Sequence, residues 1–339
     1  CFYYSQAQDW HHPDGAGNTW DFDDSKKDFA RYFSELAKPQ VRELLTQYGP
    51  LGLLWFDTPV KITKEQSHEL ANMMHSIQPE CSVSGRVGHD VGDYRSMGDN
   101  QIPVKVLEYD WETPVTLNDT WGYKKDDHNW KSTQTLIRQL VDVVSKNGNY
   151  LLNVGPTAEG LIPQPSVDRL LEVGRWLQTN REAVYGAKPS PFPYEFDWGS
   201  ITAKPGRLYL HLIDWPKSEF VLYGLKTRVK AARLLARPQE PLKVAQSYDR
   251  KADLHVVRVQ LPGAPPDKDV SVIALEIDGA AEVQPGLRQQ PDGKVTLSPA
   301  FAEIRRAESG PQLSVDSRGV ATRWFNAKEG MTWKFHLTA

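Results

Sequence analysis

Residues 47–59 read QYGPLGLLWFDTP, and this stretch carries the strongest single indication of the fold. Its apolar run, Leu51–Phe56, lies between turn residues and is too short for an independent helix, which predicts a buried strand that ends at Asp57. Trp55 comes two residues before Asp57, so both side chains project from the same face of that strand. One carboxylate and one aromatic ring would therefore share a pocket where the strand ends.

Similar short apolar runs recur through the first half of the chain. Three of them predict further buried strands, at Cys1–Ser5, Cys81–Val87 and Tyr150–Val154. Amphipathic helices are expected between them, at Lys64–Ile77, Thr133–Lys146 and Ser166–Asn180. Strands that alternate with helices form parallel sheets, and no GxGxxG motif of a nucleotide-binding sheet follows any of these strands. We therefore expect an α/β fold, a TIM-like (β/α) barrel, whose reactive side chains gather where the strands end.

The pattern changes after Lys188, where KPSPFPYEF places three prolines close together. Apolar segments of period two then recur at short intervals, at residues 207–215, 219–225, 254–261, 270–277, 294–299 and 332–337. This pattern predicts an all-β antiparallel sandwich. We therefore divide the chain into a catalytic barrel portion, residues 1–188, and a β-sandwich, residues 189–339. His211 and His255 fall on sandwich strands and are expected to be scaffold residues.

The composition excludes several kinds of partner. Forty Lys and Arg against 43 Asp and Glu give a net charge of −3 without a long run of either sign, so we expect no nucleic acid partner. No stretch approaches the roughly 18 consecutive apolar residues of a membrane span, and no signal peptide is visible in this chain. Cys1, Cys81 and the adjacent histidines His11 and His12 do not form a metal-ligand spacing. We therefore expect no metal and no cofactor.

Aromatic residues are abundant, with 11 Trp, 13 Tyr and 11 Phe, and many stand beside an acid or an amide. A flat apolar ring next to a carboxylate suits a pyranose, whose C–H face stacks while its hydroxyls form hydrogen bonds. Glycoside hydrolysis also needs two carboxylates. Asp57 is one candidate, although it could equally cap a helix or begin a turn. Asp99, on a Gly-rich loop, and Glu112, at the start of the strand-like segment WETPVTL, are candidates for the second.

Several segments resemble the α-L-fucosidases of glycoside hydrolase family 29. They are YYSQAQDWHHP (3–13), the region around LLWFD, WETPVTLNDTWGYKKDD (111–127) and, most specifically, NGNYLLNVGPTAEGLIPQP (147–165). The resemblance is strong over about the first 200 residues and only general in the sandwich. It implies a fucose-binding barrel followed by a β-domain.

The resemblance also implies residue roles. It places the catalytic nucleophile on Asp57, which ends a W-x-D strand, and the fucose pocket at Tyr4, Trp55 and Arg86. The general acid/base falls on Glu112, in the W-E-T segment, or on Asp99, with Glu112 slightly favoured. The implied activity is that of a retaining exo-α-L-fucosidase, which releases terminal fucose from fucosylated oligosaccharides or glycoconjugates through a fucosyl–aspartyl intermediate.

Barrels of that family begin upstream of the YYS strand, with a segment that bears a histidine pair. His11 and His12 follow the strand and are not that pair, so we expect an N-terminally incomplete barrel that lacks its first strands. Unpaired strand edges would leave these 339 residues alone aggregated or molten. A secreted, periplasmic or lysosomal-type location is expected from the family alone.

Two other functions fit the same residues. One is a noncatalytic fucose-binding protein that has lost its catalytic acid. The presence of two candidate acids, Asp99 and Glu112, argues against it. The other is a retaining glycosidase with a different sugar specificity.

Overall fold

The computed structural model describes the chain except for residues 251–252, 290–292, 307–311, 316–319, 325–326 and 338–339. The chain folds into two compact units. The first consists of Cys1–Met97 with Tyr109–Glu112, and the second of Gly98–Glu108 with Thr113–Ala339. Within the described residues, no helix is both long and apolar enough to cross a membrane.

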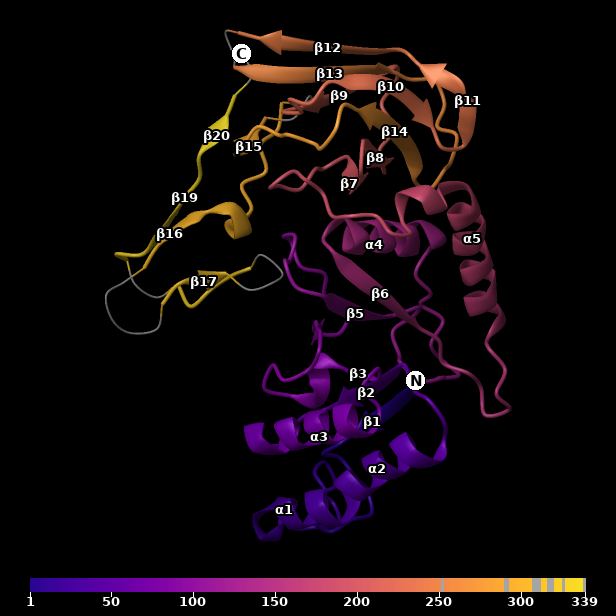
Figure 1. Cartoon of the computed structure of the whole chain (residues 1–339), viewed down its shortest axis with the longest axis vertical. Coiled ribbons are helices and arrows are strands. Elements are labelled where there is room, and N and C mark those ends of the chain that lie inside the picture. The colour runs from indigo at the N-terminus through magenta and orange to yellow at the C-terminus, as the bar shows by residue number, and fades with distance from the viewer. Residues whose placement is uncertain (251–252, 290–292, 307–311, 316–319, 325–326, 338–339) are drawn as a thin grey trace. The chain divides into compact units, whose positions relative to one another are not determined.

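The first unit is built on a parallel three-stranded sheet in the order β1-β2-β3 (Figure 1). Its strands are β1 (Phe2–Ser5), β2 (Leu53–Asp57) and β3 (Ser82–Val83). Its helices are α1 (Phe29–Tyr32), a π-helical turn (Phe33–Ala37), α2 (Lys38–Gln47) and α3 (Lys64–Ile77). The predicted strands at Cys1–Ser5 and Leu51–Phe56 are confirmed to within about two residues, and parallel pairing of β1, β2 and β3 confirms the expected sheet type.

Helix α3 has the bounds that its sequence predicts. The Thr63 hydroxyl accepts a hydrogen bond from the Gln66 backbone N–H, and the Gln66 side chain accepts one from the Thr63 N–H. This reciprocal capping box satisfies two of the backbone donors that a helix start leaves unpaired. Leu70 and Met74 on its apolar stripe are fully buried.

Side chains alternate across β2 between two environments. Leu54 and Phe56 are fully buried in one apolar core with Leu70 and Met74 of α3. Trp55 and Asp57 lie on the opposite face, as the period of a strand requires. The strand is thus fixed by its apolar face and presents its polar face at the end of the sheet.

The prediction of a third strand at Cys81–Val87 is correct only for Ser82 and Val83. Strand β3 ends at Val83, and residues Gly85–Val87 form a 3-10 turn. Gly85 lies so close to the following chain that an added Cβ would be 2.5 Å from the carbonyl oxygen of Tyr94. This close approach turns the chain out of the sheet and toward β4 (Arg95–Ser96).

A second three-stranded sheet has the order β4-β5-β6. It contains β5 (Trp111–Thr116), in the strand-like segment WETPVTL, and β6 (Gly148–Asn153), which confirms the strand expected at Tyr150–Val154. Helices α4 (Thr133–Ser145) and α5 (Gln164–Asn180) confirm the two predicted helices. In the described part of the chain, however, the strands form separate sheets and do not close into a barrel. Closure requires each strand to pair on both sides, and β1 and β6 each have one neighbour.

The rest of the second unit is dominated by two antiparallel sheets, ordered β11-β10-β14-β8-β7 and β12-β13-β9. Their strands are β7 (Gly199–Lys204), β8 (Arg207–Leu212), β9 (Glu219–Tyr223), β10 (Val229–Leu234), β11 (Arg237–Leu242), β12 (Val244–Asp249), β13 (Leu254–Gln260) and β14 (Ser271–Ile277). Short strands follow at β15 (Leu287–Arg288), β16 (Glu303–Arg305), β17 (Ser314–Val315), β18 (Ala321–Thr322), β19 (Gly330–Thr332) and β20 (Phe335–His336). The antiparallel prediction is confirmed in kind, whereas residues 294–299 form no strand and run into a 3-10 turn at Pro299–Phe301.

The five-stranded sheet is buried on both faces. Leu208 and Leu210 of β8 pack with residues of the other sheet, such as Val257 and Val259, in one sandwich core. Tyr209 lies on the opposite face and packs with Ile137 of α4 and Trp176 of α5. The five-stranded sheet is therefore the middle layer, between the sheet β12-β13-β9 on one face and helices α4 and α5 on the other.

His211 shares the helix-facing side of β8 and is completely buried. Its Nε2 lies 3.0 Å from the Thr202 hydroxyl, and its Nδ1 has no hydrogen-bond partner in the described structure. Burial lowers the pKa of His211 from 6.5 to about 3, because an apolar environment disfavours the charged ring. The residue thus belongs to the scaffold, as its strand position predicts.

We predict that His211→Gln flattens the pH dependence of stability in the complete protein. Below pH 6.5 the unfolded chain binds a proton that the folded chain does not accept until about pH 3, so stability falls as the pH falls through this window. The slope from one such group is at most about 1.4 kcal/mol per pH unit. Urea unfolding at pH 4 to 7 should show that slope reduced in His211→Gln, whereas the matched variant His255→Gln keeps it. Equal slopes in all three proteins would contradict the assignment.

Candidate active site

The end of β2 presents an aromatic and an acidic side chain against β1. Parallel pairing sets Tyr3 opposite Trp55 and Ser5 opposite Asp57. The rings of Tyr3 and Trp55 stack with centroids 5.6 Å apart and an interplanar angle of 23°. The Tyr3 hydroxyl donates a hydrogen bond of 2.7 Å to Oδ2 of Asp57.

The other oxygen of Asp57 is held by Arg86. The Arg86 guanidinium donates to Oδ1 of Asp57 at 2.9 Å and to the carbonyl of Met97 at 3.0 Å, and it lies 5.0 Å from the centroid of the Trp55 ring. Both side chains of the ion pair are 18% exposed. The carboxylate is therefore fixed in orientation by a charge-assisted hydrogen bond while part of it remains accessible.

Gln6 fixes the backbone on both sides of this ion pair. Its side-chain oxygen accepts a hydrogen bond from the Asp57 N–H at 3.1 Å, and its amide nitrogen donates to the Arg86 carbonyl at 2.8 Å. Gln6 is completely buried. A single amide thus ties the ends of β1 and β2 to the turn that carries Arg86.

Glu112 reaches the same group of side chains through Trp55. The indole Nε1 of Trp55 donates to Oε1 of Glu112 at 2.6 Å, and Glu112 as a residue is 7% exposed. The backbone of Glu112 is anchored by the pairing of β4 and β5, in which the Met97 N–H donates to its carbonyl. Burial and the nearby Glu112 carboxylate raise the pKa of Tyr94. We refer to Tyr3, Trp55, Asp57, Arg86 and Glu112 as the Asp57 group.

The structure does not bring Tyr4 to the Asp57 group. Tyr4 lies on the opposite face of β1, where its hydroxyl donates to Oε1 of Gln40 at 2.8 Å and its ring packs with the core of the first unit. Burial raises its pKa, with smaller effects from Tyr32 and Asp9. The adjacent residue, Tyr3, occupies the place that the sequence assigned to Tyr4. Sequence alone does not distinguish the two, because the face is set by the register of β1 with β2.

The remaining candidate, Asp99, is not part of the Asp57 group. Asp99 is exposed and belongs to the second unit, so the structure does not place it against Asp57. Throughout the described ranges, no three His, Cys, Asp or Glu side chains are grouped so that they could hold a metal ion.

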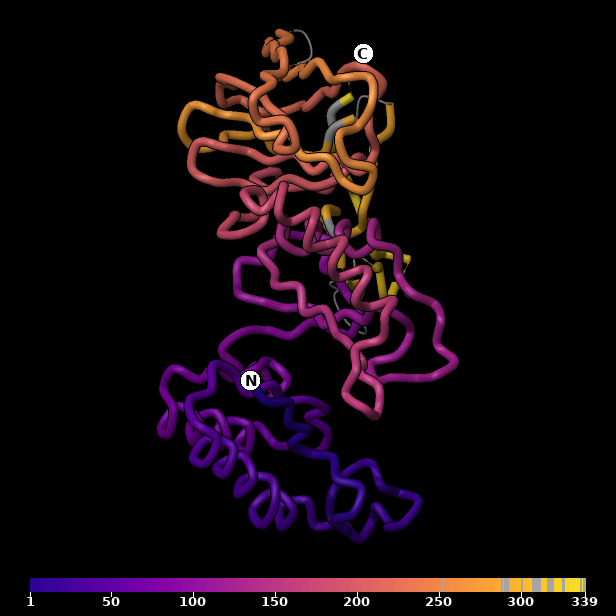
Figure 2. Tube along the Cα trace, turned by 90° about the vertical axis from the view of Figure 1, so that its right-hand side faces the viewer, coloured from indigo at the N-terminus to yellow at the C-terminus, as the bar shows by residue number. Residues whose placement is uncertain are grey.

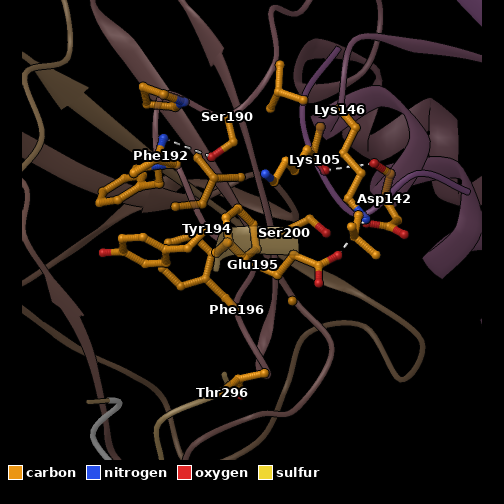
Figure 3. Close-up of a pocket in the computed structure, with 18 of the residues that line it drawn as sticks. Lys105, Asp142, Lys146, Ser190, Phe192, Tyr194, Glu195, Phe196, Ser200 and Thr296 are labelled. Carbon is orange, nitrogen blue, oxygen red and sulfur yellow. Dashed lines mark hydrogen bonds and ion pairs between the residues drawn. The ribbon is translucent and has the colours of Figure 1, made fainter. Parts of the chain in front are cut away.

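A cavity of about 540 Å³ lies in the second unit, between the end of α4 and the segment that follows Lys188 (Figure 3). Lys146 projects into it and pairs with Asp142 at 2.8 Å and Glu195 at 2.7 Å. Burial opposes the charge of Lys146, but the two carboxylates outweigh it and raise its pKa. None of the residues predicted for the site lines this cavity, and its paired charges are typical of structural ion pairs.

Comparison with known proteins gives one consistent result. The family model for alpha-L-fucosidase matches residues 1–182. Tissue alpha-L-fucosidase of Bos taurus is 32% identical over 228 residues, which are 63% of this chain and 47% of that protein. The solved alpha-L-fucosidase from Vibrio sp. strain EJY3 has a TM-score of 0.80 at 32% identity, over 92% of this chain and 58% of that one.

A second similar structure is an alpha-L-fucosidase from Bacteroides thetaiotaomicron solved as a trapped covalent intermediate. It has a TM-score of 0.69 over 82% of this chain and 68% of that one, and at 24% identity it shows likeness of fold alone. The chain spans about half the length of the curated relatives it matches.

The fold and the matched sequences are those of a glycoside hydrolase family. Within that class, the chain belongs to the alpha-L-fucosidase family, whose model covers more than half of it.

The two neighbouring tyrosines provide a matched test of the site. We predict that Tyr3→Phe lowers kcat/KM for an aryl α-L-fucoside by about 10-fold or more, because it removes a hydrogen bond to a charged group. Tyr4→Phe removes a hydrogen bond on the other face of the strand and should lower stability by about 1 kcal/mol with little effect on kcat/KM. Steady-state kinetics and urea unfolding of both variants of the complete enzyme decide this. The reverse pattern would return Tyr4 to the site.

Proposed function

We propose that this protein is a retaining exo-α-L-fucosidase that acts on terminal fucose of oligosaccharides or glycoconjugates. The observation that carries the proposal is the carboxylate of Asp57, which Tyr3 and Arg86 hold at the end of a strand, next to the ring of Trp55 and near Glu112. An ionised, oriented carboxylate beside an aromatic ring is what nucleophilic attack on a bound sugar requires.

In the first step, an oxygen of Asp57 forms a bond to the anomeric carbon while the bond to the leaving oxygen breaks. The acid donates a proton to that oxygen, so the aglycone departs as an alcohol. In the second step, the same residue, now a base, takes a proton from water, and the water oxygen displaces Asp57. Fucose is released with its original anomeric configuration, and no metal or cofactor takes part.

Contacts on Asp57 favour this chemistry. Tyr3 donates to one carboxylate oxygen and Arg86 to the other, and each oxygen keeps a further lone pair for the anomeric carbon. Arg86 also stabilises the negative charge that returns to Asp57 in the second step. The solved covalent intermediate of the Bacteroides relative supports a covalent step in this fold.

Glu112 is our first candidate for the acid/base and Asp99 the second. The hydrogen bond from Trp55 fixes Glu112 within the Asp57 group. A retaining mechanism needs its two carboxyl groups about 5–5.5 Å apart across the sugar. Asp99 lies on an exposed loop and would meet this requirement only if that loop folds over the site.

Trp55 and Tyr3 would form the apolar wall of the fucose pocket. Their stacked rings offer a surface on which the C–H edge and the methyl group of fucose can pack. Arg86 would bind a sugar hydroxyl or support the nucleophile. Tyr3 replaces Tyr4 in this proposal, because Tyr4 lies on the other face of β1.

We also propose that the α/β part of the chain belongs to a (β/α) barrel and that the boundary with the β-sandwich lies at residues 188–189. The likeness to solved fucosidases supports the barrel, and the change in strand pattern supports the boundary. A secreted, periplasmic or lysosomal-type location follows from the family only.

Removal of the nucleophile tests the mechanism directly. In the complete enzyme, Asp57→Gly should lower kcat by about 10³-fold or more, because the covalent step is lost. Added azide should restore part of the turnover and give β-L-fucosyl azide, of configuration opposite to the substrate. Near-normal activity of this variant would show that Asp57 is not the nucleophile. A protein that binds fucose without releasing aglycone, with or without azide, would instead be a fucose-binding protein.

Leaving-group dependence identifies the acid. We predict that Glu112→Ala impairs hydrolysis of fucosides with poor leaving groups far more than that of activated aryl fucosides, because the latter need no protonation. It should also flatten the basic limb of the pH profile and, with azide, give α-L-fucosyl azide. Asp99→Ala is the matched variant. If only Asp99→Ala shows this pattern, Asp99 is the acid, and if neither does, another residue holds this role.

A further inference from the structure

The loop between β1 and α1, residues 6–28, carries two exposed indole rings. Trp10 is 66% exposed and Trp20 62% exposed, although both lie in an ordered segment of the first unit. Their ring centroids are 5.5 Å apart with an interplanar angle of 85°, so one ring presents its edge to the face of the other. The tube in Figure 2 follows this loop, in indigo, from the end of β1 round to α1.

Polar contacts within the loop hold this pair in place. Asp9 accepts hydrogen bonds from the backbone N–H groups of His11 and His12, both at 2.8 Å. The Asn18 amide donates to the carbonyls of Asp9 and His12, also at 2.8 Å. Each tryptophan is thus close in sequence to a fixed backbone point, so the exposed rings are not the tip of a loose loop.

A second set of contacts anchors the rest of the loop. Lys27, whose side chain is 2% exposed, donates to the carbonyl of Gly15 at 2.7 Å and to the side chain of Asn18. Asp14 is buried and pairs with Arg31 of α1 at 2.5 Å. Gly15 packs so closely on Asp9 that an added Cβ would lie 2.9 Å from the Asp9 Cβ.

The loop is attached to the proposed active site at both of its sides. Its first residue, Gln6, binds the backbone of Asp57 and of Arg86. Near its other end, Asp24 pairs at 2.5 Å with Lys61, which follows β2 by four residues. The loop therefore borders the end of β2 on two sides, while its tryptophans belong to neither the core nor the Asp57 group.

We propose that Trp10 and Trp20 form a binding surface for the pyranose next to fucose in the substrate, the sugar that leaves as the aglycone. This inference rests on the proposed function and adds to it two residues that would recognise the sugar that leaves. Two indoles at a right angle form an apolar corner that receives the C–H face of a hexose. Exposed His11 and Asp21, next to each tryptophan in sequence, supply partners for its hydroxyls.

The test compares two kinds of substrate that differ in the leaving group. Fucosyl fluoride has no ring in its leaving group, whereas fucosyl-galactose and fucosyl-N-acetylglucosamine disaccharides have one. In the complete enzyme, Trp10→Ala and Trp20→Ala should each lower kcat/KM for the best disaccharide by about 10-fold and leave fucosyl fluoride within about twofold, since stacking on one aromatic ring is lost. Trp324→Ala, which removes a 54% exposed indole of the second unit, is the matched control and should change neither substrate.

A second measurement separates this inference from the proposed function. N-acetyllactosamine, which lacks fucose, should quench tryptophan fluorescence of the wild type and fail to do so in Trp10→Ala/Trp20→Ala. If the wild type hydrolyses fucosyl fluoride, but the tryptophan variants lose no activity specific to the disaccharides and N-acetyllactosamine causes no quenching, the binding surface is overturned and the proposed function is kept. A protein that is quenched but hydrolyses neither substrate overturns the proposed function and keeps the surface. Equal losses on both substrates, together with reduced stability, would assign the pair to packing and overturn the inference.

Discussion

Alternation along β2 is the constraint on which the first unit depends. Leu54 and Phe56 are buried against α3. Because successive side chains of a strand point to opposite faces, Trp55 and Asp57 lie on the other side of the sheet. A shift of one residue in the pairing with β1 would send Asp57 into the apolar core, where an unpaired carboxylate costs several kcal/mol. The register of Ser5 with Asp57 is thus protected by the core and, in turn, sets Tyr3 against the carboxylate.

In the second unit, the five-stranded sheet has two apolar faces, and both are covered. Strand β8 places Leu208 and Leu210 in the sandwich and Tyr209 against α4 and α5. Because both faces are covered, even a histidine on this strand is forced to remain neutral. Helices α4 and α5 therefore pack on one face of the same sheet whose other face forms the sandwich core. This shared sheet explains why the second unit includes residues 113–339 rather than beginning at residue 189.

Local features of the fold could be predicted, and long-range features could not. Helix α3 follows from its capping box and apolar stripe, and β2 from a short apolar run. Helix α2 is absent from the sequence-based predictions, although its Pro39 lies in the first turn, where no N–H is needed. The early end of β3 depends on the close approach of Gly85 to residues 94–96, which no local pattern contains. In the site, Trp55 and Asp57 follow from strand period alone, whereas the choice between Tyr3 and Tyr4 depends on pairing with a strand fifty residues away.

The internal hydrogen bonds of the loop between β1 and α1 have a consequence for how such enzymes diversify. Asp9, Asn18 and Lys27 order much of the loop from within. Gln6 and Asp24 tie its two ends to β2 and the segment that follows, and His12 and Asp14 contact Tyr32 and Arg31 of α1. A segment built in this way is a module: it can be exchanged, lengthened or rewritten during evolution, or grafted by a designer, while the carboxylate of Asp57 stays where the strands hold it.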